Sequence, residues 1–315
     1  MNFSFCNVLF PLALALAPFS AFAATEGAPA AQPATTAAAP SFFESLRWIT
    51  QLDSDASWQT PSDIKGRAGE LSAWSYSATA GFHLSNDSNV LIGALDYRYT
   101  DFDFHGVSAA PFGNMERLRL FLHYEHMFTK RWGFFVDGSG TLAAERSASL
   151  LSGGTGRIGA GVRFKLNSKL TFFSGVMVTT FLEDRALPLP FAGASWQITP
   201  RWSLNILNGV MVSCDVFEDR TLRVDLGCTI QGGNYRLAKD QSAYGARRTR
   251  ALEIWEVPLT LRVTHEFGPD GMGYVRASVG GVLYSRYRFR SSGHNIDDFG
   301  VDPAAVFKIE VGVRF

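Results

Sequence analysis

The last residues of the chain alternate strictly between apolar and polar or small side chains. The apolar positions are Phe307, Ile309, Val311, Val313 and Phe315, and the positions between them are Lys308, Glu310, Gly312 and Arg314. Because successive side chains of a β-strand point to opposite faces, a period of two gives one apolar and one polar face. A soluble β-sandwich shows the same period. Charges in mid-strand on a single face favour instead a strand with lipid on one side and water on the other.

Several upstream segments sort their side chains in the same way. In 116–128, for example, Leu118, Leu120 and Leu122 oppose a charged set, and 90–104, 155–166 and 251–266 repeat the pattern. Since a charged face must meet water, we expect these polar side chains to line an aqueous lumen. The predicted lumen residues are Asp96, Arg98, Arg117, Arg119, His123, Glu125, Arg157, Arg163 and Lys165, with Lys308, Glu310 and Arg314 of the last strand.

Short polar turns separate these segments and alternate with longer polar stretches. Tight hairpin turns are predicted at 128–132, 166–170, 198–202 and 217–222, and longer loops at 105–115, 237–250 and 291–302. The Asn208-Gly209 pair is a strong signal for a further hairpin inside 202–217. The segments between turns predict an all-β, antiparallel, up-and-down transmembrane barrel of about fourteen strands, with twelve as the alternative.

The amino-terminal part has a different composition from the rest. Residues 1–23 contain an apolar run followed by Ala21-Phe22-Ala23, which predicts a secretory signal peptide with its cleavage site. Residues 24–40 are rich in Ala and Pro, which predicts a flexible linker. Residues 41–315 are then the barrel domain.

The charge balance argues against nucleic acid as a partner. The chain carries 29 Lys and Arg and 29 Asp and Glu, so its formal net charge is zero, and no basic patch or tail stands out. The chain also has no run of about 20 apolar residues after the signal, which is what a transmembrane helix requires. The expected lipid contacts therefore come from strands.

The terminal strand and its final aromatic residue resemble the ends of bacterial outer-membrane β-barrels. The segments Gln231–Leu237 and Glu256–Val263 resemble recurring strand sequences of uncharacterised, porin-like barrel families. This resemblance implies an outer-membrane location, with both termini in the periplasm and outer-membrane lipid as the surrounding medium. It also implies recognition by the barrel-assembly machinery, with Phe307, Ile309, Val311, Val313 and Phe315 as the assembly signal.

Two patterns are candidates for a catalytic or metal site. The run His83-Leu84-Ser85-Asn86 resembles the His-x-Ser-Asn segment of outer-membrane phospholipases, but the Gly-Arg that follows in those enzymes is missing. His123 and Glu125 are only two ligands, two residues apart, and a hydrogen-bonded lumen pair explains them better than a metal ion does. We therefore expect no enzyme activity, no cofactor and no metal.

A second group of arginines lies near the carboxy terminus, at Arg286, Arg288 and Arg290, with Arg276 earlier in the same predicted strand. If this ladder lines the lumen, its positive potential favours anions. Alternatively, acidic residues of the wall neutralise it, and the candidates are Glu310, Glu256, Asp96, Asp137 and Asp225. The sequence leaves both interpretations open.

Two cysteines remain outside the signal peptide, Cys214 and Cys228, and both fall on the apolar face of adjacent predicted strands. A disulfide is expected only if the strand register places them opposite each other. Otherwise they are two small lipid-facing residues.

Taken together, these patterns predict a porin-like channel for passive passage of small hydrophilic solutes, with a mild anion preference. No segment is long enough for a plug domain. The alternative is a structural or surface ligand-binding barrel that does not conduct, with loops 237–250 and 291–302 as its contact surface. A barrel enzyme is the third hypothesis.

Deleting Phe315 should reduce the amount of assembled barrel in the outer membrane, because the aromatic terminus is part of the expected assembly signal. The measurement is the fraction of heat-modifiable protein in outer-membrane fractions. Normal assembly of a chain lacking Phe307–Phe315 would contradict the prediction of a membrane barrel.

Overall fold

The computed structural model describes residues 47–207, 209–238 and 250–315. The predicted signal peptide and linker, residues 1–40, lie outside the described residues, as does most of the predicted loop 237–250. Among the described residues, no helix has the length and apolar character needed to cross a bilayer.

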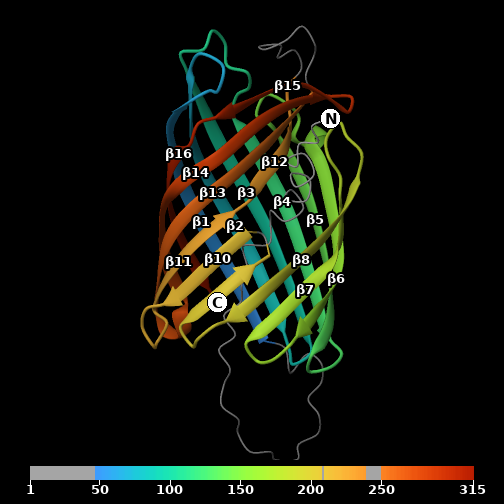
Figure 1. Cartoon of the computed structure of the whole chain (residues 1–315), viewed down its shortest axis with the longest axis vertical. Coiled ribbons are helices and arrows are strands. Elements are labelled where there is room, and N and C mark those ends of the chain that lie inside the picture. Colours follow the sequence, from blue (N-terminus) through green and yellow to red (C-terminus); the bar gives the residue numbers. More distant parts are fainter. Residues whose placement is uncertain (1–46, 208, 239–249) are drawn as a thin grey trace, which may run out of the picture.

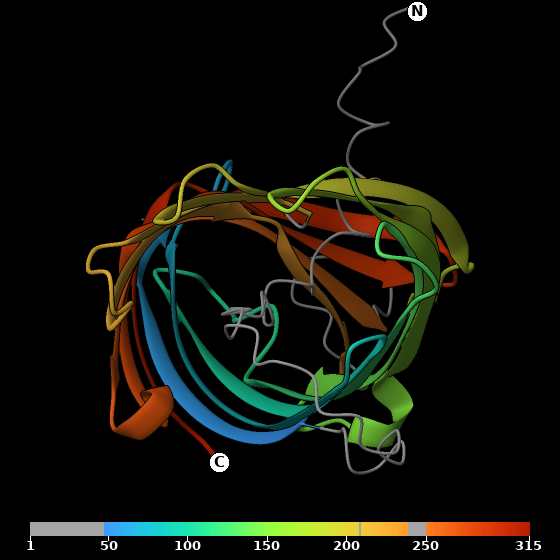
Figure 2. The ribbon, with the colours of Figure 1, turned by 90° about the horizontal axis from the view of Figure 1, so that it is seen from below.

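The described chain is almost entirely antiparallel β-sheet, closed into a barrel (Figures 1 and 2). The strands are β1 (Arg47–Asp63), β2 (Glu70–Ser85), β3 (Asn89–His105), β4 (Met115–Met127), β5 (Trp132–Glu145), β6 (Gly154–Lys165), β7 (Leu170–Thr179), β8 (Leu187–Gln197), β9 (Trp202–Ile206), β10 (Gly209–Asp215), β11 (Leu222–Thr229), β12 (Gln231–Arg236), β13 (Ala251–Phe267), β14 (Gly273–Ser291), β15 (His294–Val301) and β16 (Ala304–Arg314). Two short 3-10 turns, η1 (Leu150–Gly153) and η2 (Pro269–Gly271), complete the elements.

The 16 strands β1 to β16 form a barrel whose wall has 14 strands, because two wall strands are each divided into two parts. β11 and β12 are two parts of one wall strand, separated at Ile230, and β15 and β16 are two parts of another. The barrel closes where β16 pairs with β1, with Ile309 opposite Ala56. This arrangement confirms the predicted all-β, up-and-down barrel of about fourteen strands.

Most strand positions agree with the sequence prediction, including the hairpin in 202–217. β9 and β10 pair antiparallel with Val210 opposite Ile206. The prediction that 291–302 forms a loop is wrong, because β15 occupies most of this segment and pairs with the second half of β14. The segment is polar enough to resemble a loop, but it satisfies its backbone groups in the sheet.

The two ends of the barrel differ in their connections. The tight turns, such as the one between β2 and β3, gather at one end, which we call the turn end (bottom of Figure 1). The connections between β3 and β4 and between β7 and β8 belong to the opposite end, which we call the loop end. Both Arg47 and Phe315 lie at the turn end, because β1 begins opposite the end of β2 and Phe315 bonds to Thr50.

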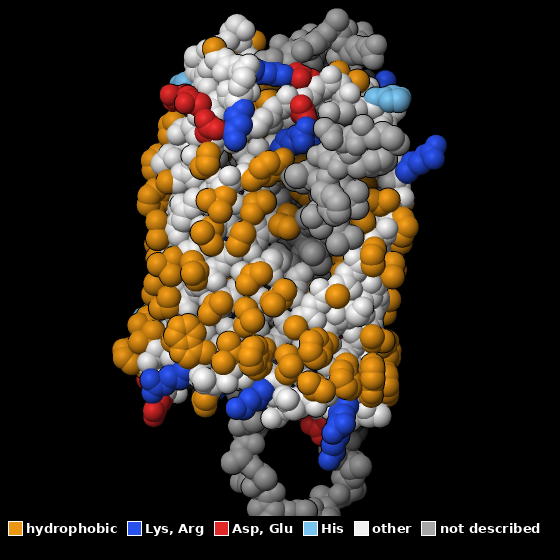
Figure 3. All heavy atoms as spheres, viewed as in Figure 1, with side chains coloured by type: hydrophobic (Ala, Val, Ile, Leu, Met, Phe, Trp, Pro, Cys, Tyr) orange, Lys and Arg blue, Asp and Glu red, His pale blue; other side chains and the backbone are white. Residues whose placement is uncertain are grey.

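The outer face of the barrel is apolar over most of its height. Figure 3 shows hydrophobic side chains covering the visible wall, with Lys, Arg, Asp and Glu concentrated at the two ends. Exposed outward side chains include Leu120, Ile158 and Ile309. Trp132 and Trp202 are exposed at the turn end, where aromatic residues anchor barrels at the membrane interface. An apolar belt between charged rims is the outer surface of a transmembrane barrel.

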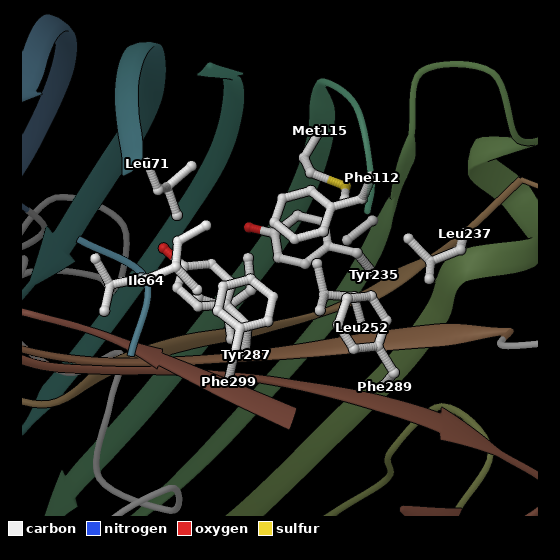
Figure 4. Close-up of a cluster of buried hydrophobic side chains, with 13 residues drawn as sticks. Ile64, Leu71, Phe112, Met115, Tyr235, Leu237, Leu252, Tyr287, Phe289 and Phe299 are labelled. Carbon is white, nitrogen blue, oxygen red and sulfur yellow. The ribbon is translucent and has the colours of Figure 1, made fainter. Parts of the chain in front are cut away.

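The inside of the barrel near the loop end is packed with apolar side chains (Figure 4). This loop-end core consists of Ile64, Leu71, Phe112, Met115, Ala143, Tyr235, Leu237, Leu252, Ile254, Tyr287, Phe289, Phe299 and Val301. Phe112, in the loop between β3 and β4, has a ring centroid 5.1 Å from that of Phe102 and 5.8 Å from that of Tyr287. The opposite walls therefore meet through the loop-end core, which fills this part of the lumen.

The wall is interrupted on one side toward the loop end. Only Ala194–Gln197 of β8 pairs with β9, and among the described residues no strand pairs with the same edge of β8 over 187–193. The backbone N–H of Gln197 donates to the carbonyl of Lys169, next to β7. Because N–H groups alternate in direction along a strand, those of the odd-numbered residues of β8 point toward β7. The N–H sites of the even-numbered residues point toward the opposite edge, which no described strand pairs with over 187–193. Those positions include Pro188 and Pro190, which have no N–H to leave unsatisfied.

The two faces of β4 should tolerate substitution differently. Leu120 is 52% exposed on the outer face, so Leu120→Arg places a charge toward hydrocarbon and should cost about 2–4 kcal/mol of unfolding free energy. Arg119→Leu on the inner face should cost much less. Urea titrations of the barrel folded into lipid vesicles measure both, and equal losses would contradict the assignment of the faces.

Candidate functional site: the lumen wall

The structure places most of the predicted lumen residues on the inner face. On β3 and β4, the outward positions Leu95 and Leu120 are exposed, and the alternating positions carry the charges. By the same alternation, the inner set comprises Asp96, Arg98, Arg117, Arg119, His123, Glu125, Arg157, Arg163, Lys165, Arg276, Lys308, Glu310 and Arg314. The lumen wall is thus charged below the loop-end core.

One group of these side chains is an ion-pair network across β4, β5 and β6. Arg163 donates to Glu125, and Nδ1 of His123 forms a hydrogen bond with Asp137. Nε2 of His123 lies 3.9 Å from Glu125, so both imidazole nitrogens face carboxylates. The network holds the lumen pair of His123 and Glu125 in place through neighbouring strands. Among the described residues, no group of three or more His, Cys, Asp or Glu is arranged to bind a metal ion.

A second network joins β1, β14 and β16 at the barrel seam. Glu310 accepts from Arg276 at 2.7 Å and from Lys308 at 3.2 Å, and Lys308 also lies 3.1 Å from Asp55. Tyr274 donates to Glu310 at 2.9 Å. The terminal strand is therefore tied to its neighbours on the lumen side by charges and on the lipid side by its apolar residues.

A third group is a cluster of arginines on β3 and β4, which we call the arginine cluster: Arg98, Arg117 and Arg119. Arg98 lies directly opposite Arg117 in the strand pairing, and Arg119 lies opposite Asp96. Arg117 donates to Asp96 at 2.9 Å. The Nε atom of each of these arginines is buried and has no hydrogen-bond partner among the described residues.

The prediction that Arg286, Arg288 and Arg290 line the lumen is wrong. Val257 lies opposite Tyr284 but the next residue, Pro258, lies opposite Val282, which leaves Leu283 as an extra residue in β14. A bulge of one residue exchanges the two faces of the strand beyond it.

The side chains beyond the bulge follow this exchange. Tyr287 and Phe289 point into the loop-end core, with 0% and 3% of their surface exposed. Arg286, Arg288 and Arg290 alternate with these two residues along β14 and therefore point outward near the loop end. Arg276 precedes the bulge and remains on the inner face.

The outward arginines pair with acidic residues other than those expected from the sequence. Arg286 pairs with Asp298 of β15, and Arg290 pairs with Glu253 of β13 and with Asp184 in the loop between β7 and β8. In the same loop, Glu183 accepts from Arg236 at 2.6 Å, and this bond holds the pKa of the Glu183 carboxyl below its usual range. These contacts attach the loop to the outer side of β12 and β14.

The two cysteines are free thiols and do not form the disulfide considered above. Both lie on adjacent strands, but the register of β10 and β11 places Cys214 opposite Val224 and Cys228 opposite Val210. Cysteines must lie close to directly opposite each other to bridge two strands, and this pairing separates them along the strands.

The His83-Leu84-Ser85-Asn86 segment has a structural role at the turn end. Asn86 accepts hydrogen bonds from the backbone N–H groups of Ser88 at 3.0 Å and Asn89 at 2.8 Å. These bonds shape the turn between β2 and β3, which accounts for the asparagine without a catalytic function.

The sequence prediction missed the loop-end core. The sequence signal for this core is a change from charged to aromatic side chains along the inner face of a strand. On β3, Asp96 and Arg98 are followed at the same parity by Phe102 and Phe104. A change from charged to aromatic residues at one parity marks where a lumen wall becomes a packed core. Phe112 gave no such signal, because it lies in a loop.

No protein-family model matches the chain, and no curated protein matches it. Solved structures with a similar arrangement include an outer membrane channel from Pseudomonas putida F1, with 9% identity, a TM-score of 0.43, and 89% of this chain and 100% of that chain covered.

Two further similar structures are the P. putida toluene transporter TodX and the NanC porin. TodX has 10% identity and a TM-score of 0.40, with 85% of this chain and 90% of that chain covered. NanC has 7% identity and a TM-score of 0.35, with 83% and 98% covered.

Deleting Leu283 should disrupt the loop-end core, because removal of the extra residue turns Tyr287 and Phe289 outward or forces the strand pairing to slip. We expect a clear decrease in the urea concentration at the unfolding midpoint. Leu283→Ala is the matched control, since it keeps the residue count and should have a much smaller effect. Equal midpoints for the deletion and the control would contradict the role of the bulge.

Proposed function

We propose that the chain is an outer-membrane channel for small hydrophilic solutes. The observation that carries the proposal is the charged inner wall between the loop-end core and the turn end. There, the buried Nε atoms of the arginine cluster have no hydrogen-bond partner among the described residues. Leaving such donors unsatisfied is costly, so they require water or a solute. A hydrated lumen inside an apolar wall is the basic requirement for a channel.

The loop-end core is the part of the lumen that limits passage. Its side chains, with Phe112 1% and Tyr287 0% exposed, are packed as tightly as a protein interior. We infer that the structure represents a closed channel, which conducts when the loop between β3 and β4 withdraws Phe112 from the core. This gate is part of the wall and its loops rather than a separate plug domain.

The same core favours the alternative function, a barrel that does not conduct and serves as a structural or ligand-binding element. In that case the loop end, including the outward arginines, is the contact surface. The two functions differ in one measurable property, the passage of ions through the purified protein in a planar bilayer.

We also propose that the turn end faces the periplasm. Short turns are periplasmic and longer loops extracellular in barrels of this kind, and Arg47 and Phe315 both lie at the turn end. In this orientation the terminal strand would be accessible to the barrel-assembly machinery from the periplasm.

Phe112→Ala should raise the conductance of the channel, because it removes the loop's aromatic anchor from the loop-end core. Single-channel recordings in planar bilayers should show larger or more frequent openings than the unmodified protein. Phe172→Ala, on the lipid-facing side of β7, is the control and should leave conductance unchanged. If neither the unmodified protein nor Phe112→Ala conducts while circular dichroism shows an intact barrel, the channel proposal fails and the binding or structural function replaces it.

A further inference from the structure

The arginine cluster brings like charges together on the lumen wall. Arg98 and Arg117 are direct cross-strand neighbours on β3 and β4, and Arg119 is the next residue on the same face of β4. Like charges directly opposite each other in a sheet repel and destabilise it. A cluster of this kind is stable when negative charges or solvent compensate the repulsion.

Protein carboxylates compensate only part of this charge among the described residues. Asp96 accepts from Arg117 at 2.9 Å, and its other oxygen lies 3.4 Å from the hydroxyl of Thr79. The Nε atoms of Arg98 and Arg119 have no hydrogen-bond partner among the described residues. Asp96 therefore interacts with all three guanidinium groups, through a hydrogen bond from Arg117 and electrostatically with Arg98 and Arg119.

The facing walls add two further acidic residues that are already engaged. Glu256 of β13 is close enough to Arg98 to interact electrostatically, and it accepts from Tyr287 at 3.4 Å. Asp55 of β1 interacts with Arg117 at longer range, but it is bound by Lys308 at 3.1 Å and by Ser77. The Nε donors of all three arginines thus lack an acceptor among the described residues.

The side chains around the cluster are small and polar. Ser77 lies opposite Arg98, and Thr141 lies opposite Arg119. Guanidinium groups present several N–H donors in a fixed geometry that matches the oxygens of carboxylate and phosphate groups. The Ser77 hydroxyl already donates to Asp55, so the Thr141 hydroxyl is the one that can donate a further hydrogen bond to the same oxygens.

We propose that Arg98, Arg117 and Arg119 form a binding site in the lumen for a small oxyanion, the carboxylate or phosphate group of a hydrophilic solute. The site lies just below the loop-end core, since Met115 and Ala143 of that core are neighbours of Arg117 on β4 and β5. A bound anion therefore lies next to the closed gate, on the side of the loop-end core that faces the turn end. The role of the site in transport rests on the channel function proposed above, whereas binding itself does not.

Calorimetric titration of the purified full chain, folded in detergent micelles, with inorganic phosphate tests the site directly. We expect saturable binding that chloride at the same ionic strength does not reproduce. Arg119→Gln should weaken phosphate binding roughly tenfold, since it removes a charged hydrogen-bond donor. Arg98→Gln is a second variant with the same expected direction, and heat-modifiability checks that each variant is folded.

The matched control is Arg286→Gln, which removes an arginine of the outward ladder that pairs with Asp298. This variant should bind phosphate as the unmodified protein does. The inference is overturned if the folded unmodified protein shows no phosphate binding, or if Arg119→Gln and Arg98→Gln bind as tightly as the control. Binding without any conductance would instead retain the site and remove the channel function, so the two failures are distinguishable.

Discussion

The whole structure depends on closing the backbone hydrogen-bond ladder in a medium without water. Within hydrocarbon, each unpaired N–H or C=O costs several kcal/mol, so a sheet that crosses a membrane must pair its first strand with its last. Here β1 and β16 form that seam. The even number of wall strands and the position of Arg47 and Phe315 at the same end follow from this closure. The alternation of lipid-facing and lumen-facing residues has another origin, the pleat of each strand, which points successive side chains to opposite faces.

Because each strand has a strict period of two, the sequence predicted the strands and the inward side of most charged wall residues well. The prediction failed where β14 departs from that period by one residue. Leu283 looks like any apolar strand residue, and only its pairing with β13 reveals that it is extra. Every side chain beyond it changes face, which is why Arg286, Arg288 and Arg290 were misplaced. The cysteines were undecided for a related reason, since register depends on the partner strand.

The lumen combines a charged wall with the apolar loop-end core, and the sequence revealed the first but not the second. Most of the inward charged residues were predicted, because charge and parity are both visible in the sequence, but the three arginines beyond the bulge were wrongly included among them. The loop-end core was not predicted, because it forms when strands far apart in the sequence, such as β3 and β14, meet across the barrel. A loop residue, Phe112, completes the contact. Closure of the lumen is thus a tertiary property, whereas the polarity of the wall is a local one.

The prolines on the edge of β8 that no described strand pairs with have a consequence for how copies of the barrel meet in the membrane. An open strand edge usually recruits another strand, and two barrels could fuse their sheets there. Pro188 and Pro190 offer no N–H groups to such a partner. Sheet-to-sheet joining at this edge is therefore disfavoured, and neighbouring barrels can contact each other here only through side chains or intervening lipid.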